Sequence, residues 1–189
     1  DRERMGSLMG IAESKGARYA GLPAGGVAVI NADDAFGAYF AERASGNRLL
    51  RFGLEASADV TARDVRTSAE GSQFTLLTPQ GEVAITLPLP GRHNVLNAIA
   101  AASLALACGV SLSTIAEGLA AVQPVPGRQI ARDLGNGVVL VDDSYNANPA
   151  SLDAAMDALV AAAGESWLVL GDMRELDEQG GELHVQAGR

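Results

Sequence analysis

Short polar side chains follow a run of apolar residues in the segment 138–151, which reads VVLVDDSYNANPAS. The apolar run predicts a buried strand, and it is followed by Asp142, Asp143, Tyr145 and Asn146. In parallel α/β sheets, ligands bind beyond the carboxyl ends of the strands. Asn148 as the N-cap and Pro149 as the first residue of a helix would explain those two residues structurally. The four polar residues before them stay unexplained by that reading, so the pattern favours a ligand site.

A second polar pair begins a helical segment, 87–102, which reads LPLPGRHNVLNAIAAA. Asn94 and Asn97 are three residues apart and therefore share one face of the predicted helix. An amide offers a donor beside an acceptor, which matches the N6 and N7 edge of adenine. The alternative is that one asparagine caps the helix and the other is solvated. His93 is one of two histidines in the chain, so we expect it to cap or pack at the helix entry rather than bind a metal.

Lys15 is the only lysine of the chain, and it lies on a predicted amphipathic helix within GSLMGIAESKGARYAGLP, residues 6–23. The other thirteen basic residues are arginines. A lone lysine on such a helix is usually a solvated charge. Because it is the only lysine, a particular chemical role for it is also open.

Composition narrows the possible functions. The chain has 189 residues, of which 48% are hydrophobic and 20% charged, enough for one large domain or two smaller ones. A net charge of −9 argues against a general nucleic-acid or anionic-membrane surface. No apolar run reaches membrane-spanning length, and the start DRERMGS is not a signal peptide. The single cysteine, Cys108, allows no disulfide within the chain, suits a reducing compartment, and is expected to pack in the core.

The elements that must position these residues can be read from periodicity and turn signals. We predict strands over 26–34 and 48–54, helices over 35–45, 91–109 and 111–122, and two or three antiparallel strands within 59–89. Gly109 is expected to end one helix, and Ser111 or Ser113 to cap the next.

The segment QPVPGRQ, residues 123–129, is the best candidate for a domain boundary, because two prolines and a glycine separate helices from strands. After it we predict strands over 129–134, 137–143 and 166–172, a helix over 149–163, and a further helix starting within 178–188. This order indicates a parallel α/β unit with a right-handed crossover.

Taken together, these segments resemble the Mur ligase family. The resemblance covers nearly the whole chain and rests on segments that occur in the family order: GSLMGIAESKG, VAVINADD, LPLPGRHNVLNAIAAASLA, VPGR, VDDSYNANPAS and LVLGDMREL followed by His184. GRHNxxNxxAA is shared across the family. DDSYNANP, and GDMREL with His184 nine residues after Glu175, are similar to the branch that adds D-alanyl-D-alanine.

The resemblance implies an α/β fold in two parts. Residues 1–125 are expected to form the later half of a central ATPase domain with a small antiparallel β section. Residues 126–189 are expected to form the first half of a Rossmann-like C-terminal domain. The phosphate-binding loop G-x-x-x-x-G-K-[ST] is absent from these residues, so we expect a fragment that is inactive by itself.

The resemblance also implies a reaction. Such an enzyme is a cytoplasmic, monomeric, ATP-dependent ligase of peptidoglycan precursor synthesis. It uses ATP and Mg²⁺ to convert a carboxylate of a UDP-N-acetylmuramoyl-tripeptide into an acyl phosphate, which D-alanyl-D-alanine attacks to form an amide. Nucleic acid and membrane are not expected partners. The alternatives are another ligase on the same scaffold, of the folylpolyglutamate synthetase or cyanophycin type, and a non-catalytic nucleotide-binding module.

Roles of individual residues follow from the same resemblance. Lys15, carbamylated by CO₂, is the expected catalytic group and Mg²⁺ ligand. The expected ATP contacts are Asn94 and Asn97 to adenine, Arg128 to the phosphates and Asp143 to the ribose, with Tyr145 and Asn146 in the same loop. His184 either binds the dipeptide or is structural, and the roles of Asp172 and Glu175 are left open. The chain departs from the usual family pattern at Asp1, Ala17 and Asp177.

Overall fold

A computed structural model describes residues 7–68, 70–128, 130–161, 164–173 and 180–188 of the chain. The chain divides into two compact units, one of residues 12–124 and one of residues 125–189 grouped with residues 1–11. None of the helices in this described part is long and apolar enough to cross a lipid bilayer.

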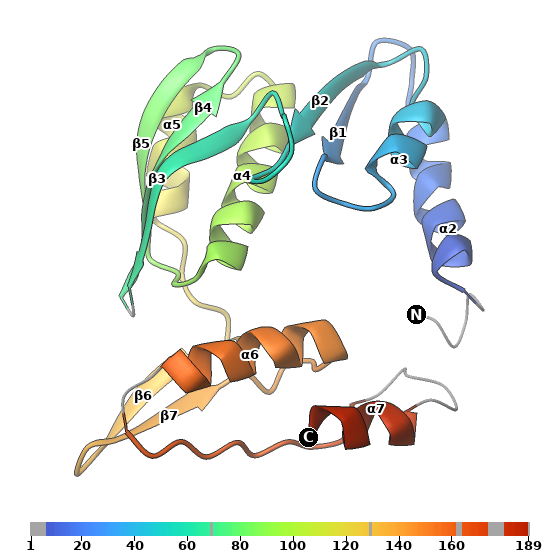
Figure 1. Cartoon of the computed structure of the whole chain (residues 1–189). Helices are drawn as coiled ribbons and strands as arrows, with labels where there is room; N and C mark the ends of the chain where they lie inside the picture. Colours follow the sequence, from blue (N-terminus) through green and yellow to red (C-terminus); the bar gives the residue numbers. More distant parts are fainter. Residues whose placement is uncertain (1–6, 69, 129, 162–163, 174–179, 189) are drawn as a thin grey trace. The chain divides into compact units, whose positions relative to one another are not determined.

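The larger unit begins with two parallel strands covered by helices on both faces. β1 (Val27–Asn31) pairs in parallel with β2 (Arg48–Phe52), and the helices before and after β1 are α2 (Leu8–Ala20) and α3 (Gly37–Arg43). Ala28 and Ile30 of β1 are buried against α2 and α3, whereas Leu50 of β2 faces the core formed with α4 (Arg92–Ala107). Figure 1 shows α2 and α3 on one side of this strand pair and α4 on the other. The carboxyl ends of β1 and β2 therefore meet at one edge, between two helical layers.

A three-stranded antiparallel sheet completes this unit. β3 (Thr61–Ser68), β4 (Gly71–Thr78) and β5 (Gly81–Leu87) lie in that order, so the 59–89 segment forms three strands. Side chains alternate along β4, with Phe74 and Leu76 buried and Gln73 exposed. The buried face packs against α4 and α5 (Leu112–Ala120), and this contact forms the main hydrophobic core of the unit.

Local signals at the helix ends act as predicted. Ser111 caps α5, because its Oγ accepts a hydrogen bond from the Thr114 N–H at 3.2 Å. Gly109 follows α4 with φ of 81°, a conformation that glycine adopts without steric cost. The prediction for Cys108 is wrong: it is exposed at the end of α4, because the buried face of that helix passes through Ala102 and Leu106 and not through position 108.

The smaller unit contains an antiparallel hairpin and two helices. β6 (Ile130–Gly135) and β7 (Val138–Asp142) pair through a tight turn in which Asn136 and Gly137 have φ of 54° and 78°. The helices are α6 (Pro149–Ala161) and α7 (Gly180–Ala187).

The prediction of a strand over 166–172 is wrong. Residues 165–173 form no strand in the structure, so the predicted parallel crossover unit is not assembled from the described residues. An apolar run becomes a stable strand only when a neighbour accepts its hydrogen bonds and another layer covers its side chains. Among the described residues, β6 is the only strand that pairs with β7, and Trp167 and Val169 are 80% and 94% exposed. The mixed α/β class itself is confirmed.

Candidate functional site

The first two turns of α4 carry the two predicted adenine contacts. The Asn94 Nδ2 donates a hydrogen bond of 2.7 Å to the carbonyl oxygen of Pro90, and this leaves the Oδ1 acceptor available. Asn97 lies one turn further and is exposed. The buried side chains of this part of α4, Val95, Ala98 and Ile99, fasten the opposite face to the core. The helix therefore holds two amides at its start while its other face is fixed.

His93 lies at the entry of α4, where its side chain is exposed. Gly91 has φ of 91°, and a Cβ at that position would lie 2.7 Å from the Cε1 of His93. The imidazole thus covers the glycine directly before the helix. Among the described residues, no group of three or more His, Cys, Asp or Glu side chains could hold a metal ion.

Lys15 is presented to solvent by α2. Ala12 and Gly16 form the buried side of that helix, and a Cβ on Gly16 would lie 3.0 Å from the Tyr39 ring. The ammonium makes no hydrogen bond or ion pair with another described residue. Because α2 and α4 cover opposite faces of the β1–β2 pair, the structure does not bring Lys15 against the two asparagines.

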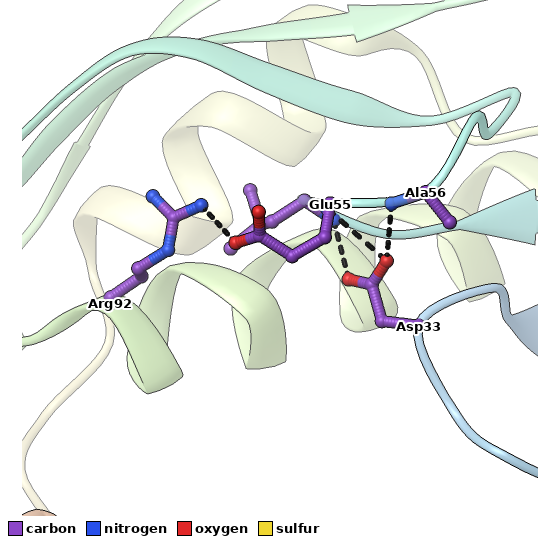
Figure 2. Close-up of polar contacts among 5 residues, drawn as sticks. Asp33, Glu55, Ala56 and Arg92 are labelled. Atoms are coloured by element: carbon purple, nitrogen blue, oxygen red, sulfur yellow. Dashed lines mark hydrogen bonds and ion pairs between the residues drawn. The ribbon is translucent and has the colours of Figure 1, made fainter.

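One group that sequence reasoning missed lies at the carboxyl ends of β1 and β2. The Asp33 carboxylate accepts three backbone N–H bonds: Oδ2 from Leu54 at 2.7 Å, and Oδ1 from Ala56 at 2.7 Å and Glu55 at 3.2 Å (Figure 2). Burial by itself raises the pKa of Asp33, but the N–H bonds and the Arg92 charge outweigh burial and lower it. The ionised carboxylate is therefore part of the folded state. The sequence signal was NADD, which reads equally well as an ordinary turn.

The same segment is tied to the start of α4. The Glu55 side chain forms an ion pair with Arg92, the first residue of that helix (Figure 2). Both side chains are more than half exposed. Asp33, Glu55 and Arg92 therefore link the β1–β2 edge to the turn that carries Asn94.

In the smaller unit, the structure joins Arg128 to Tyr145. The guanidinium carbon of Arg128 lies 4.2 Å from the centre of the Tyr145 ring. The Tyr145 N–H donates to the Gly127 carbonyl oxygen at 2.9 Å. Gly127 has φ of 75°, and a Cβ there would lie 3.0 Å from the Tyr145 nitrogen, so glycine allows the two segments to meet. Two predicted ATP contacts are thus held together.

The two aspartates after β7 differ in their surroundings. Asp142 Oδ1 accepts from the Oγ of Ser144 at 2.6 Å and from its N–H at 3.2 Å, and these bonds lower the pKa of Asp142. Asp142 is therefore a turn-forming residue. Asp143 is half-buried and makes no hydrogen bond or ion pair with another described residue, and Asn146 is exposed. Asp143 and Asn146 therefore remain available for a ligand.

Asn148 begins α6 as predicted for an N-cap. Its Oδ1 accepts from the Ser151 N–H at 3.0 Å, and the Ser151 Oγ accepts from the Asn148 N–H at 3.0 Å. Part of the polar segment after β7 is therefore structural.

His184 contacts the segment that contains GDM. Its Nε2 accepts the Met173 N–H at 3.0 Å, so an imidazole on α7 holds this backbone in place. Asp172 is exposed, and Glu175 lies outside the described residues.

Comparisons with known proteins agree with this arrangement of elements. Residues 2–105 match the Mur ligase middle domain, and residues 127–189 match the domain described as Mur ligase, glutamate ligase domain. The chain is 42% identical over 187 residues to the UDP-N-acetylmuramoyl-tripeptide–D-alanyl-D-alanine ligase of Escherichia coli strain K12, covering 98% of this chain and 41% of that protein. The chain thus spans about two fifths of the length of such relatives.

Solved structures give the same result. A crystal structure of MurF from Acinetobacter baumannii matches with a TM-score of 0.90 at 36% identity, covering 98% of this chain and 40% of that one. MurF ligase from Thermotoga maritima, solved in complex with ADP, matches with a TM-score of 0.80 at 26% identity, covering 97% and 42%. With more than half of its residues matched by the middle domain alone, the chain belongs to the Mur ligase family.

Proposed function

We propose that the whole protein to which these residues belong is an ATP-dependent ligase that joins D-alanyl-D-alanine to a UDP-N-acetylmuramoyl-tripeptide. The observation that carries this proposal is the likeness over 98% of the chain to the Escherichia coli ligase of that name. The same likeness supports assigning residues 1–125 to the later central domain and residues 126–189 to the start of the C-terminal domain.

The side chains present fit a nucleotide. Asn94 keeps an acceptor, and Asn97 offers a complete exposed amide, which suits the edge of adenine. Arg128 presents a flat guanidinium, a shape that pairs with phosphate oxygens in bidentate fashion. Asp143 has an uncommitted carboxylate, which accepts hydrogen bonds from ribose hydroxyls. In this proposal Tyr145 supports Arg128, and Asn146 lies in the same loop.

ATP supplies the phosphoryl group that activates the substrate carboxylate for attack by the incoming amine. The residues of this chain bind and orient: Arg128 stabilises phosphate charge, and the two asparagines fix the base. Lys15 fits a metal site only after carbamylation. Addition of CO₂ to the neutral amine releases one proton and replaces a cation, which repels Mg²⁺, by an anion with two oxygen ligands.

The test is ADP release by the whole protein. We expect release only when UDP-N-acetylmuramoyl-tripeptide, D-alanyl-D-alanine, ATP and Mg²⁺ are all present, with one product amide formed per ADP. Activity with glutamate in place of D-alanyl-D-alanine would instead favour a ligase of the folylpolyglutamate type. Nucleotide binding without any ADP release would favour a non-catalytic module. Cytoplasmic location and a monomeric state stay predictions.

A further inference from the structure

We propose that Asp33 is a positioning residue for the nucleotide base. Together with Gly53, residues 54–56 and the Glu55–Arg92 ion pair, it forms what we call the Asp33 clip. The clip orients the start of α4, and thereby the amide of Asn94 in the first turn and that of Asn97 in the next turn. This inference rests on the proposed function, since it assigns the clip a part in distinguishing adenine from other bases.

The carboxylate joins two segments that are distant in the sequence. Asp33 follows β1, and residues 54–56 follow β2, so the three N–H bonds link the ends of two parallel strands at one edge. Both carboxylate oxygens are engaged. The Asp33 N–H also donates to the Asn31 Oδ1 at 2.9 Å, which restrains the aspartate backbone. Because both the backbone and the carboxylate of Asp33 are held by hydrogen bonds, the aspartate restrains the position of residues 54–56.

Gly53 is part of the clip because it leaves space for the carboxylate. A Cβ at position 53 would lie 2.8 Å from the Asp33 Oδ1 and 3.0 Å from its Cγ. The Gly53 N–H also donates to the Val60 carbonyl oxygen at 3.2 Å, which limits backbone movement there. A side chain at position 53 would therefore displace the aspartate.

Glu55 connects the Asp33 carboxylate to α4. Its backbone N–H is bound to Asp33, while its carboxylate pairs with Arg92 in the first turn of the helix (Figure 2). In the same turn, Asn94 binds the carbonyl oxygen of Pro90. The start of α4 is thus held by Pro90 on one side and by Glu55 on the other.

The core does not need this ion pair, so its expected role is orientation. Val95, Ile99 and Leu106 bury α4 over its length, whereas Glu55 and Arg92 are largely exposed. A paired donor and acceptor discriminate between bases only when both bonds have good distance and angle. A looser first turn should therefore weaken adenine recognition more than it weakens folding.

The experiment compares ATP and GTP affinity in variants of the whole protein. Binding is measured by calorimetric titration, and thermal unfolding is followed in parallel. Arg92→Gln and Glu55→Gln are expected to lower the ATP-to-GTP preference by about two- to fivefold, the range that an exposed ion pair can produce. Asp33→Asn replaces one accepting oxygen with a donor, and we expect it to lower the ATP-to-GTP preference by about tenfold. The charge swap Glu55→Arg with Arg92→Glu should restore part of the preference.

A matched control is present in the three-stranded sheet. Arg63 and Glu82 form an ion pair at 2.9 Å, with side chains 53% and 55% exposed. Arg63→Gln breaks a pair of similar exposure that does not involve α4, and it should leave the ATP-to-GTP preference unchanged.

The outcomes separate this inference from the proposed function. If Asp33→Asn and Arg92→Gln keep the full ATP preference, or if Arg63→Gln lowers it equally, the positioning role is overturned while the ligase assignment stands. If the unaltered protein binds ATP and GTP equally or neither of them, the adenine site itself is wrong. Arg92→Gln is expected to fold, because its side chain contributes nothing to the core.

Discussion

Two side chains, those of Arg128 and Tyr145, together determine the orientation of a guanidinium in the smaller unit. The guanidinium carbon of Arg128 lies 4.2 Å from the centre of the Tyr145 ring, and such a cation–π contact is worth about 0.5–2 kcal/mol. The stack fixes the direction of the guanidinium before any anion arrives. A lysine at position 128 would keep the positive charge but would lose both the contact with the Tyr145 ring and the planar, bidentate guanidinium.

We therefore predict that Arg128→Lys weakens ATP binding in the whole protein by about tenfold, which corresponds to about 1.4 kcal/mol. Tyr145→Phe should bind ATP normally because the ring remains, whereas Tyr145→Ala should resemble Arg128→Lys. Arg132→Lys, at an exposed position of β6, serves as the control. Calorimetric titration with ATP measures all four, and equal affinity in Arg128→Lys would show that fork geometry is irrelevant.

Lys15 belongs to the same scale, since it is exposed and unpaired among the described residues. Lys15→Ala should lower kcat by at least about 100-fold, the effect of removing one charge-stabilising group, and leave the unfolding temperature unchanged. Arg18→Ala, which removes an exposed charge one turn further along α2, should keep normal activity. Partial recovery of Lys15→Ala activity with short-chain carboxylic acids would support the carbamate. Undiminished activity would remove Lys15 from the site.

At the scale of elements, the Asp33 clip couples stability to pH. The pKa of Asp33 in the folded state is lower than its ordinary value of 3.8, so between these two values the unfolded chain binds more protons. The stabilisation is thus fully present above about pH 5 and is lost as the pH falls through the folded pKa.

We predict that Asp33→Asn lowers the free energy of unfolding at pH 7 by about 1 kcal/mol, since the carboxylate is partly accessible to water. The difference from the unaltered chain should shrink as the pH falls from 5 to 3. Urea unfolding at several pH values measures it. Glu117→Gln, an exposed position of α5, is the control. A difference that stays constant over this range would show that ionisation of Asp33 is not involved.

At the scale of the whole molecule, the two units differ in how well they cover their apolar residues. The larger unit buries its core residues between helices and strands. In the smaller unit, Val139 and Val141 of β7 are more than half exposed, as is Trp167. The four consecutive apolar residues 138–141 are all exposed, and an exposed apolar run usually marks a surface that another layer covers.

The single tryptophan makes this testable in the 189-residue chain. Trp167 is 80% exposed, so its emission should match that of a tryptophan amide in water and should be quenched fully by iodide. Emission from the folded chain, with folding verified by circular dichroism, should therefore differ little from emission in denaturant. A clear blue shift on folding would contradict the exposed position.

The sequence by itself determined the local features of this protein. The helices over 91–109 and 111–122, the caps Ser111 and Asn148, and the glycine after α4 depend on neighbouring residues, and each of them is confirmed. The family motifs could also be recognised from the sequence alone, because each of them is a continuous segment.

Only the tertiary structure decided which distant groups meet. Asp33 binds residues 21 to 23 positions away, and Glu55 pairs with a residue 37 positions away. No local pattern specifies such partners, because charge and amide groups pair with many others and the chain path selects one. The same reason explains why the prediction of a strand over 166–172 is wrong. An apolar run has a high propensity for strand, but a strand forms only where a neighbouring backbone can form hydrogen bonds with it.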